Sequence, residues 1–514
     1  MKPPIILKKQ IGTLRRKKTF NFAGRLTKKY KEARIFLVGG IVRDWLLKRD
    51  CQDFDLVISG VPAKKLRDFL KKEGRVNLVG ARFGVFKFIP KNSRLTIDIA
   101  LPRTEHAFGT GGYRDVETQS DWRLPIEKDL ARRDFTINAL ALELKIKNKN
   151  LTIENLIDPF GGLKDLKRKL IRAVGQPKER LQEDYSRLLR ALRFAAQLNF
   201  MIEKKTWNVL RKKMPQINKM AGETRLAPYE VIAKEFIKSL INNPVKTMDL
   251  WDASGAFKEL MPEILKMKNC PQPLEFHGEG DVWAHTKLAL AALSKPGFKK
   301  FVKILPPNFA PAPLVSPELV LAILLHDIGK PSTIKTPEKD GTERIRTDEH
   351  DTMGAQLAQQ MGERLRLNSV PDYPCHLNKI AWLIEKHLLT VHGDPMKFTN
   401  RTIEKYFFNP LLPGGDLLKL IYCDQMASYV NGQPQLGSLP RLVKRIKNLL
   451  KSLKQKKTLP PPLLDGRQIM LLLKIKPGPM VGKIIEKLRE GQLDGKIKNK
   501  KQAGIFILKL PRQI

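Results

Sequence analysis

The sequence predicts a protein of several domains in which an α/β domain precedes mostly helical ones. Its 514 residues correspond to about three or four domains of ordinary size. Residues 33–165 mix short apolar, strand-like runs with glycine pairs and helical stretches, a pattern typical of an α/β domain. Residues 166–270 have mostly helical periodicity, and seven of the eight histidines fall between residues 277 and 392. Any histidine ligands for a metal are therefore concentrated in that later region.

The charge of the chain indicates a polyanionic partner. Lysine and arginine number 95 against 52 acidic residues, which gives a formal net charge of +43. This excess is larger than solubility requires, and like charges destabilise the compact state unless something neutralises them. A basic surface acquired for other reasons is the alternative, and nucleic acid is the favoured explanation.

Several classes of protein are excluded by composition. No apolar run approaches the roughly 20 residues that cross a bilayer, so no membrane association is expected. The four cysteines are far apart and form no CxxC pair, which indicates a reducing, cytoplasmic environment. Residues 1–32 are predicted to be a basic arm that binds nucleic acid, with an organellar transit peptide as the alternative.

Two aspartates separated by one residue indicate a magnesium site in the α/β domain. In a strand of period two, Asp53 and Asp55 share one face, while the apolar residues beside them point to the other. Magnesium prefers oxygen ligands and divides its coordination between carboxylates and substrate phosphates. Asp98, within the strand-like run 95–99, would complete the site if that strand pairs beside the first. Solvated strand ends are the alternative explanation for all three carboxylates.

Glycines and arginines near this pair suit a nucleoside triphosphate. A glycine pair at 39–40 follows the apolar run 35–38, where the absence of a side chain lets backbone N–H groups approach a phosphate. Further along the chain, Arg132 and Arg133 suit triphosphate oxygens, and Asn138 suits a ribose hydroxyl.

A helical segment over residues 180–193 offers a way to select the incoming base. Its apolar positions share one face, whereas Asp184 and Arg187 lie on another, at the spacing of helix neighbours. An intrahelical ion pair worth about 0.2–0.5 kcal/mol is the simpler explanation. Alternatively, the aspartate accepts from an exocyclic amine and the arginine donates to ring acceptors, which selects C or A. Guanine and uracil would present a carbonyl to the aspartate, and an unsatisfied buried polar group costs about 1–3 kcal/mol.

The motifs of this region resemble those of the class II tRNA nucleotidyltransferases and related bacterial poly(A) polymerases of the DNA polymerase β superfamily. The matching segments are GGIVRD at 39–44, DFD at 53–55, RRDFTINAL at 132–140 and DPFGG at 158–162. The resemblance implies a polymerase β-like head with a mixed sheet, in which Asp53 and Asp55 are catalytic and bind magnesium. One ion would activate a terminal 3′ hydroxyl, and the other would hold the triphosphate.

The family's EDxxR motif matches residues 183–187 and favours CCA addition, because poly(A) polymerases typically carry a basic residue in place of Glu183. The resemblance also assigns glycine-rich loops such as 103–122 to the switch from C to A addition. The nucleotide-binding residues expected from the motifs are Gly39, Gly40, Arg43, Asp98, Arg132, Arg133, Asp134, Asn138, Asp184, Arg187 and Arg190.

A second group of polar residues occupies the histidine-rich region. His326 and Asp327 stand at the polar end of an apolar run, and histidine nitrogen with carboxylate oxygen suits a transition metal or Mg²⁺. A single histidine on an apolar helix is more often a core residue. The ordered set is hard to obtain by accident, and it comprises His285, His326, Asp327, His350, His387 and Asp424.

This set resembles the HD-domain phosphohydrolases, through FHGEGDVWAHT at 276–286 and LLHDIGKP at 324–331. The resemblance implies that His350 and His387 bind a second metal beside the first, with Mg²⁺, Mn²⁺ or Ni²⁺ as the ion. It also implies hydrolysis of phosphomonoesters or 2′,3′-cyclic phosphates at RNA ends. A retained metal-binding scaffold without activity would have the same ligands.

The expected domains are a basic N-terminal arm at 1–32, the head at 33–165, a helical neck at 166–270, an HD body at 271–435 and a basic helical tail at 436–514. The expected activity is template-independent addition of CCA to the 3′ end of tRNA from CTP and ATP, with Mg²⁺ as cofactor. A poly(A) polymerase and an RNA-processing HD phosphohydrolase are the alternatives. The oligomeric state is left open.

Overall fold

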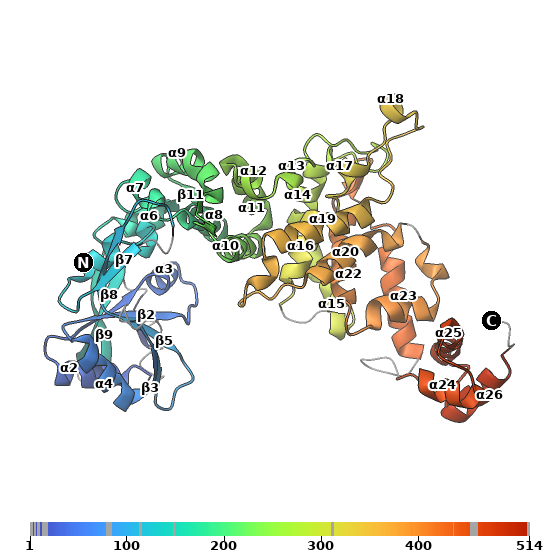
Figure 1. The fold of residues 1–514 in the computed structure, drawn as a ribbon, viewed down its shortest axis with the longest axis horizontal. Helices are drawn as coiled ribbons and strands as arrows, with labels where there is room; N and C mark the ends of the chain where they lie inside the picture. The colour runs from blue at the N-terminus through green and yellow to red at the C-terminus, as the bar shows by residue number, and fades with distance from the viewer. Residues whose placement is uncertain are drawn as a thin grey trace. The chain divides into compact units, whose positions relative to one another are not determined.

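The structure, a computed structural model, describes residues 4, 7, 11–12, 19–78, 85–112, 116–147, 150–309, 313–391, 393–434, 436–452 and 461–510. The chain divides into two compact units, Met1–Leu260 and Met261–Ile514 (Figure 1). Part of the predicted basic arm, including its basic run at 15–18, lies outside the described residues. Among the residues that are described, no helix is long and apolar enough to cross a membrane.

The first unit contains a seven-stranded mixed sheet in the order β3-β4-β5-β2-β1-β8-β9. Its strands are β1 (Arg34–Val38), β2 (Phe54–Ser59), β3 (Gly74–Leu78), β4 (Val85–Pro90), β5 (Ile97–Ala100), β8 (Ala141–Lys147) and β9 (Asn150–Ile157). Strands β2 and β5 run parallel, whereas the other neighbours are antiparallel. The predicted α/β head with a mixed sheet is confirmed.

Both faces of this sheet are covered, which explains why its central strands are so apolar. On one face, Phe36 and Val57 pack in a buried cluster with Leu130 of α5 (Ile126–Ala131). On the other face, the rings of Phe88 and Phe22 meet with their centroids 5.0 Å apart. Phe22 belongs to α2 (Asn21–Lys29), so the end of the predicted arm is a helix of the head.

The glycine-rich segment 103–122 is in part a hairpin. Strands β6 (Arg103–Ala107) and β7 (Val116–Ser120) pair in antiparallel fashion, and residues 113–115 between them lie outside the described part of the chain. The carbonyl oxygen of Gly111 accepts the backbone N–H of Tyr185 at 2.9 Å. The hairpin loop is therefore attached to the segment that carries the EDxxR motif.

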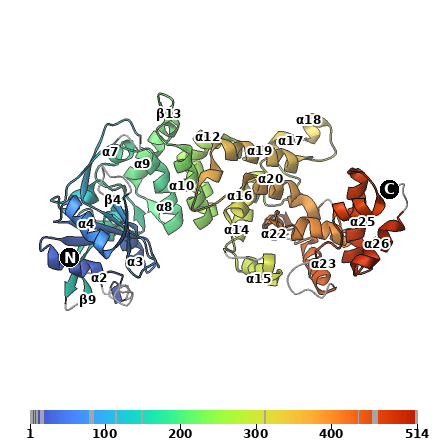
Figure 2. The ribbon, with the colours of Figure 1, turned by 60° about the horizontal axis from the view of Figure 1, so that its bottom comes forward.

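Helices connect some of the strands and make up most of the chain after the sheet, as predicted. In the first unit they include α3 (Gly40–Leu46), α4 (Ala63–Glu73), α6 (Gly162–Arg168), α7 (Pro177–Gln182), α8 (Ser186–Leu198), α9 (Lys204–Lys213), α10 (Tyr229–Asn242), α11 (Pro244–Ser254) and α12 (Ala256–Leu260). Helix α8 packs beside α10 (Figure 2). The helical segment expected over 180–193 is two helices rather than one. The chain breaks at 183–185 because the Asp184 carboxylate accepts the N–H of Ser186 at 2.8 Å, where α8 begins.

The longer helices of the second unit are α14 (Val282–Ala292), α15 (Pro296–Ile304), α16 (Pro317–Leu325), α19 (His350–Arg364), α20 (Leu377–Lys386), α22 (Gly414–Gln425) and α23 (Leu439–Ser452). Helix α16 is central to this unit, and it is buried at nearly every position because it is apolar on all sides. Helices α14, α20 and α22 pack against it, and α19 packs on α20. A separate cluster of apolar side chains joins α24 (Gly466–Leu473), α25 (Pro479–Leu493) and α26 (Lys500–Leu508).

Candidate active site and metal centre

A cavity of about 800 Å³ in the first unit is lined by side chains of the sheet and of α8 and α10. The residues of the head and neck that were predicted to bind nucleotide or magnesium all line this one cavity. They are Gly39, Gly40, Arg43, Asp53, Asp55, Asp98, Arg132, Arg133, Asp134, Asn138, Asp184, Arg187 and Arg190. Residues up to about 150 positions apart in sequence are thus brought to one site.

Three carboxylates meet at the edge where β2 and β5 run parallel. Asp55 on β2 stands in register with Asp98 on β5, and Asp53 directly precedes β2. Burial, together with the neighbouring charge of Asp53, raises the pKa of Asp55 to about 6. A divalent cation would relieve this crowding of negative charge, so the three side chains fit the magnesium that the family implies.

The glycine turn after β1 brings the backbone close to an arginine. Gly39 has φ of 74°, and a Cβ atom there would lie 2.6 Å from Nη1 of Arg133. A side chain at this position would be strained and would also displace the guanidinium. Arg133 pairs with Asp129 at 3.2 Å, but its Nε atom and that of Arg103 are buried without a hydrogen-bond partner among the described residues. Both guanidinium groups are therefore suited to phosphate oxygens.

A chain of hydrogen bonds crosses from the head to α8. Arg43 Nη1 donates to Asn138 Oδ1 at 2.8 Å, and Asn138 Nδ2 donates to Asp134 Oδ1 at 3.0 Å. Asp134 Oδ2 accepts from Arg190 Nε at 2.8 Å. Burial alone would raise the pKa of Asp134, but the charge of Arg190 and hydrogen bonds from Asn138 and Arg190 hold it well below its usual range. The amide of Asn138, expected to suit a ribose, is thus engaged by protein partners.

The two residues expected to select the base are held by different partners. Asp184 is largely enclosed, and burial raises the pKa of its carboxyl group. Arg187 donates to Glu183 and to the carbonyl oxygen of Arg180, at 2.9 Å for the latter. The ion pair of Arg187 is therefore made with Glu183, four residues earlier. The guanidinium group of Arg187 and the carboxylate of Asp184 are therefore both fixed in orientation at the cavity wall.

Sequence reasoning missed several residues of the cavity. Arg103 and Glu105 on β6 line it, as do Lys234 and Glu235 on α10. Glu105 pairs with Arg132, and Glu235 pairs with Arg193 of α8. No motif marks these positions, because they belong to elements that reach the site only through the tertiary fold. Arg103, the basic residue at the start of the segment 103–122, was the one signal in the sequence that could have indicated a contribution of this segment to the site.

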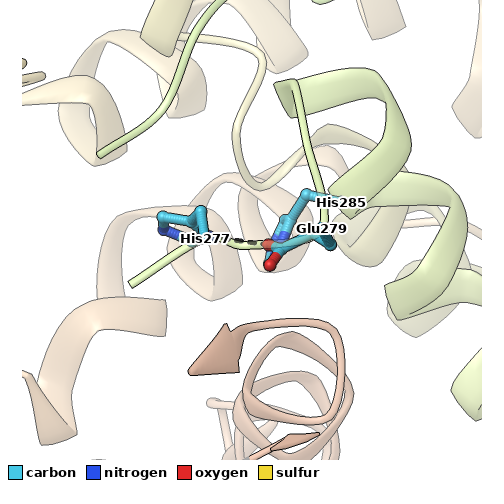
Figure 3. Close-up of side chains that lie close together, drawn as sticks. All are labelled: His277, Glu279 and His285. Atoms are coloured by element: carbon cyan, nitrogen blue, oxygen red, sulfur yellow. Dashed lines mark hydrogen bonds and ion pairs between the residues drawn. The ribbon is translucent and has the colours of Figure 1, made fainter. Parts of the chain in front are cut away.

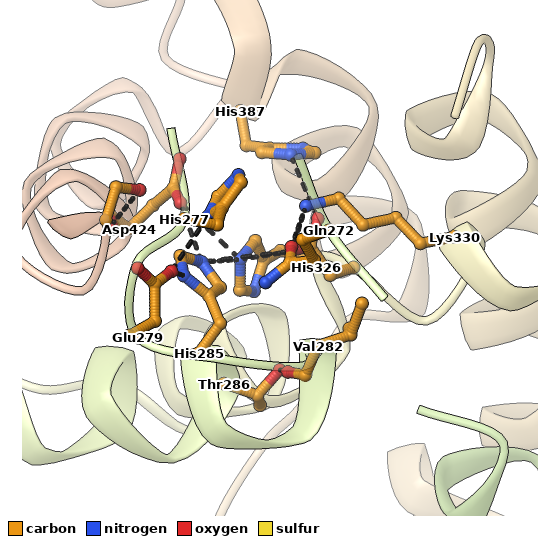
Figure 4. Close-up of polar contacts among 12 residues, drawn as sticks. Gln272, His277, Glu279, Val282, His285, Thr286, His326, Lys330, His387 and Asp424 are labelled. Carbon is orange, nitrogen blue, oxygen red and sulfur yellow. Dashed lines mark hydrogen bonds and ion pairs between the residues drawn. The ribbon is translucent and has the colours of Figure 1, made fainter. Parts of the chain in front are cut away.

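Four ligand atoms converge at the HD motif in the second unit (Figure 4). His285 Nε2 lies 3.0 Å from Asp424 Oδ1 and 3.2 Å from His326 Nε2. Asp327 Oδ2 lies 3.4 Å from His326 Nε2 and 3.8 Å from His285 Nε2. Tetrahedral ligands at 2.0–2.2 Å from an ion are separated by roughly 3.4 Å, so these atoms fit one divalent metal.

The other carboxylate oxygen of Asp327 faces a second group. Asp327 Oδ1 lies 3.4 Å from His350 Nε2 and 3.8 Å from His387 Nε2. The Nε2 atom of His350 is buried and has no hydrogen-bond partner within the described part of the chain. Burial lowers the pKa of His387 to about 4, helped by His326 and His350, so this ring is neutral as a metal ligand must be. The structure thus brings together all six predicted HD residues.

The loop before α14 adds polar residues that the motifs did not single out. Nδ1 atoms of His277 and His285 each lie 2.7 Å from Glu279 Oε1 (Figure 3). Burial would raise the pKa of Glu279, but hydrogen bonds from both histidines and from the Tyr429 N–H lower it to about 2. Lys330 Nζ lies 2.7 Å from Asp327 Oδ2. The spacing of Glu279 and His285 within 276–286 was the signal that could have identified this carboxylate.

Comparison with known proteins identifies two domains in the chain. The Poly A polymerase head domain matches residues 35–172, and the HD domain matches residues 308–415. The A-adding tRNA nucleotidyltransferase of Deinococcus radiodurans is 30% identical over 482 residues, which cover 92% of this chain and 94% of that protein. The Multifunctional CCA protein of Neisseria meningitidis serogroup B is 31% identical over 360 residues, which cover 70% and 73%.

Solved structures share the fold. The Bacillus stearothermophilus CCA-adding enzyme in complex with CTP aligns over 99% of this chain and 98% of its own, with a TM-score of 0.56 and 18% identity. The Thermotoga maritima CCA-adding enzyme complexed with tRNA aligns over 96% and 93%, with a TM-score of 0.53 and 21% identity. The mixed sheet and its carboxylate-lined cavity define a nucleotidyltransferase. On the matches in sequence, this enzyme belongs to the tRNA nucleotidyltransferase family.

Proposed function

We propose that the enzyme adds C, C and A to the 3′ end of tRNA from CTP and ATP. The observation that carries this proposal is that Asp53 and Asp55 line the same cavity as Asp184 and Arg187. Metal binding and base selection therefore belong to one site, as polymerisation without a nucleic-acid template requires. Solved structures that share the fold are complexes of CCA-adding enzymes with ATP, with CTP and with tRNA, which supports the same substrates here.

In this proposal the residues of the cavity divide the chemistry among them. Asp53 and Asp55 would hold Mg²⁺, which when bound supplies charge for in-line displacement at the α-phosphate, with pyrophosphate as the leaving group. The unpartnered guanidinium nitrogens of Arg103 and Arg133 bind triphosphate oxygens. The backbone at Gly39 leaves room for the phosphates, and the remaining polar network fixes these side chains in place before substrate binds.

Base selection follows from the fixed polar groups at the start of α8. The Asp184 carboxylate, held by the N–H of Ser186, accepts from the exocyclic amine of C or A. Arg187, held by Glu183, donates to a ring acceptor. Uracil and guanine would place a carbonyl oxygen against the carboxylate and leave two buried acceptors unsatisfied.

The names of the relatives include both A-adding and CCA-adding enzymes, so the test must separate these activities. Purified protein is supplied with labelled CTP and ATP, singly and together, on tRNA lacking CCA and on tRNA ending in CC. Two C and one A on the first tRNA, lost in Asp55→Ala, supports the proposal. Incorporation of A on the second tRNA alone indicates an A-adding enzyme, and ATP-only tailing of many RNAs indicates a poly(A) polymerase.

A second candidate function is phosphoester hydrolysis at the HD motif. The observation that favours it is Asp327, whose two oxygens face two separate groups of histidines. A pair of divalent ions held there would supply a bound water as nucleophile and charge for the phosphate. Ring opening of 2′,3′-cyclic phosphate RNA to a phosphomonoester, or phosphate release from 3′-phosphorylated RNA, supports this function if it survives Asp55→Ala and is lost in Asp327→Ala. Hydrolysis that survives both changes contradicts it.

We also propose the domain assignment that the sequence indicated. The head and neck would form the transferase, and the HD body and basic tail would follow. The net charge of +43 supports tRNA as the polyanionic partner of the whole chain.

A further inference from the structure

Glu279 is a buried carboxylate on the loop that leads into α14, outside the set of metal ligands described above. Its side chain is 2% exposed. Oε1 lies 2.7 Å from Nδ1 of His277 and 2.7 Å from Nδ1 of His285, and Oε2 accepts the backbone N–H of Tyr429 at 2.9 Å. Both oxygens are therefore engaged, by three segments of the second unit.

Three possible ligands within reach of one another can also indicate a metal site, and His277, Glu279 and His285 form such a group. The geometry indicates hydrogen bonds instead. Both ring nitrogens approach the same oxygen at hydrogen-bond distance, whereas ligands around a divalent ion are typically more than 3 Å apart. The remaining oxygen is occupied by a backbone donor. Glu279 thus acts on its neighbours as an acceptor.

The hydrogen bond to His285 determines which ring nitrogen is free. With Nδ1–H donated to Glu279, the other nitrogen, Nε2, is directed at His326 Nε2 and Asp424 Oδ1 (Figures 3 and 4). The contact with Tyr429 adds a second constraint. Tyr429 lies five residues after Asp424, so the same carboxylate also anchors the chain at the end of α22.

We propose that Glu279 is the positioning residue of the HD metal centre, fixing the His285 tautomer and holding the Asp424 segment against it. The inference rests on the proposed metal centre at Asp327. Carboxylates in this outer position generally change metal affinity by about 10–100-fold when they are removed. The nucleotidyltransferase site lies in the other unit of the chain, so its activity is unaffected.

The test is titration of the metal-free full-length protein with Co²⁺, followed by its visible absorption. The signal is defined as the absorption lost in Asp327→Ala. For Glu279→Gln we expect affinity about 10–100-fold weaker and an altered spectrum, because the amide cannot accept from both rings. Glu275→Gln is the matched control, since it removes one charge from the same loop at a side chain that is 67% exposed. Its affinity should stay within about twofold of wild type.

A further variant separates positioning from direct coordination. His277→Gln leaves the Glu279–His285 contact in place and should weaken Co²⁺ binding by no more than about threefold. A loss as large as that of Glu279→Gln would make His277 a ligand and overturn the inference, as would wild-type affinity in Glu279→Gln. If Glu279→Gln does not fold, Glu279→Asp is used in its place. Co²⁺ affinity and a Co²⁺ spectrum equal to those of wild type in Glu279→Asp would also overturn the inference. Absence of Co²⁺ binding in the wild type would instead refute the metal centre itself, and this inference with it.

Discussion

Asp55 and Asp98 stand directly opposite each other on the parallel strands β2 and β5. Parallel neighbours place paired side chains on the same face of a sheet, so the register alone brings two carboxylates to one point. Asp53, one pleat away from Asp55, adds a third at the cavity. This pairing concentrates negative charge where the surrounding chain is strongly basic.

Asp55→Asn should abolish nucleotide addition while leaving the fold intact. We expect incorporation of labelled CTP to fall by about 10²–10³-fold or more, because a charge that stabilises the transition state is removed. The midpoint of thermal unfolding at pH 7.5 should rise, since the pKa of about 6 means that ionising this buried group opposes folding above that pH. Asp68→Asn, an exposed carboxylate on α4, is the control and should change neither quantity.

Gly39→Ala should raise the KM for nucleoside triphosphates about tenfold, because strain of about 1–2 kcal/mol and a displaced Arg133 weaken phosphate binding. Gly109→Ala is a matched control, since Gly109 also has φ of 74° but has open space around its Cβ position. Steady-state kinetics with CTP would distinguish the two variants. If Gly39→Ala and Gly109→Ala raise the KM by the same factor, backbone strain, and not the contact with Arg133, governs the effect.

Asp134→Asn should destabilise the first unit near neutral pH, because it removes the nearer of the two carboxylates beside Arg190 and leaves Glu235, 4.0 Å away. We expect a loss of about 1–3 kcal/mol in the free energy of unfolding, less than for a fully buried pair because the Arg190 side chain is 36% exposed. The folded-state pKa of Asp134 is depressed, so its stabilisation is present above about pH 4, the unfolded value, and is lost as pH falls. Urea unfolding at pH 7 and pH 3 checks this, and an equal difference at both values contradicts it.

Asp184→Ala should relax the choice of base. Discrimination between CTP and UTP, measured as the ratio of kcat/KM, should fall by about 10–100-fold, in line with the cost of an unsatisfied buried acceptor. Glu179→Ala, an exposed acidic residue on α7, serves as the control and should retain the wild-type ratio. An unchanged ratio in Asp184→Ala would remove this residue from base selection.

The sequence predicted those parts of the molecule that depend on local pattern. The apolar runs at 35–38 and 56–58 became central strands, and the spacing of Asp53 and Asp55 placed them at one cavity. Periodicity could not foresee the break before α8, because a hydrogen bond from Ser186 to Asp184 competes there with helix continuation.

Side-chain contacts between distant segments of the chain could not be predicted from the sequence either. Asn138 was expected at a ribose, but Arg43 and Asp134, which lie on either side of it in the fold, occupy its amide. Glu279 stands close to His285 in the segment 276–286, but this spacing does not show what its carboxylate contacts, and only the folded loop brings it against two histidines. Such residues act through contacts between elements, which spacing along the chain does not encode.

The residues proposed as ligands of the HD metal centre lie at the ends of the helices that form the bundle. His326 and Asp327 follow α16, whose side chains are buried, while His285 and Asp424 lie on helices packed against it. The bundle's own packing therefore dictates the spacing of the ligands. Selection for stability of the domain would by itself preserve this arrangement. Evolution could therefore remove hydrolytic activity at the metal centre and leave the packing of the bundle unchanged.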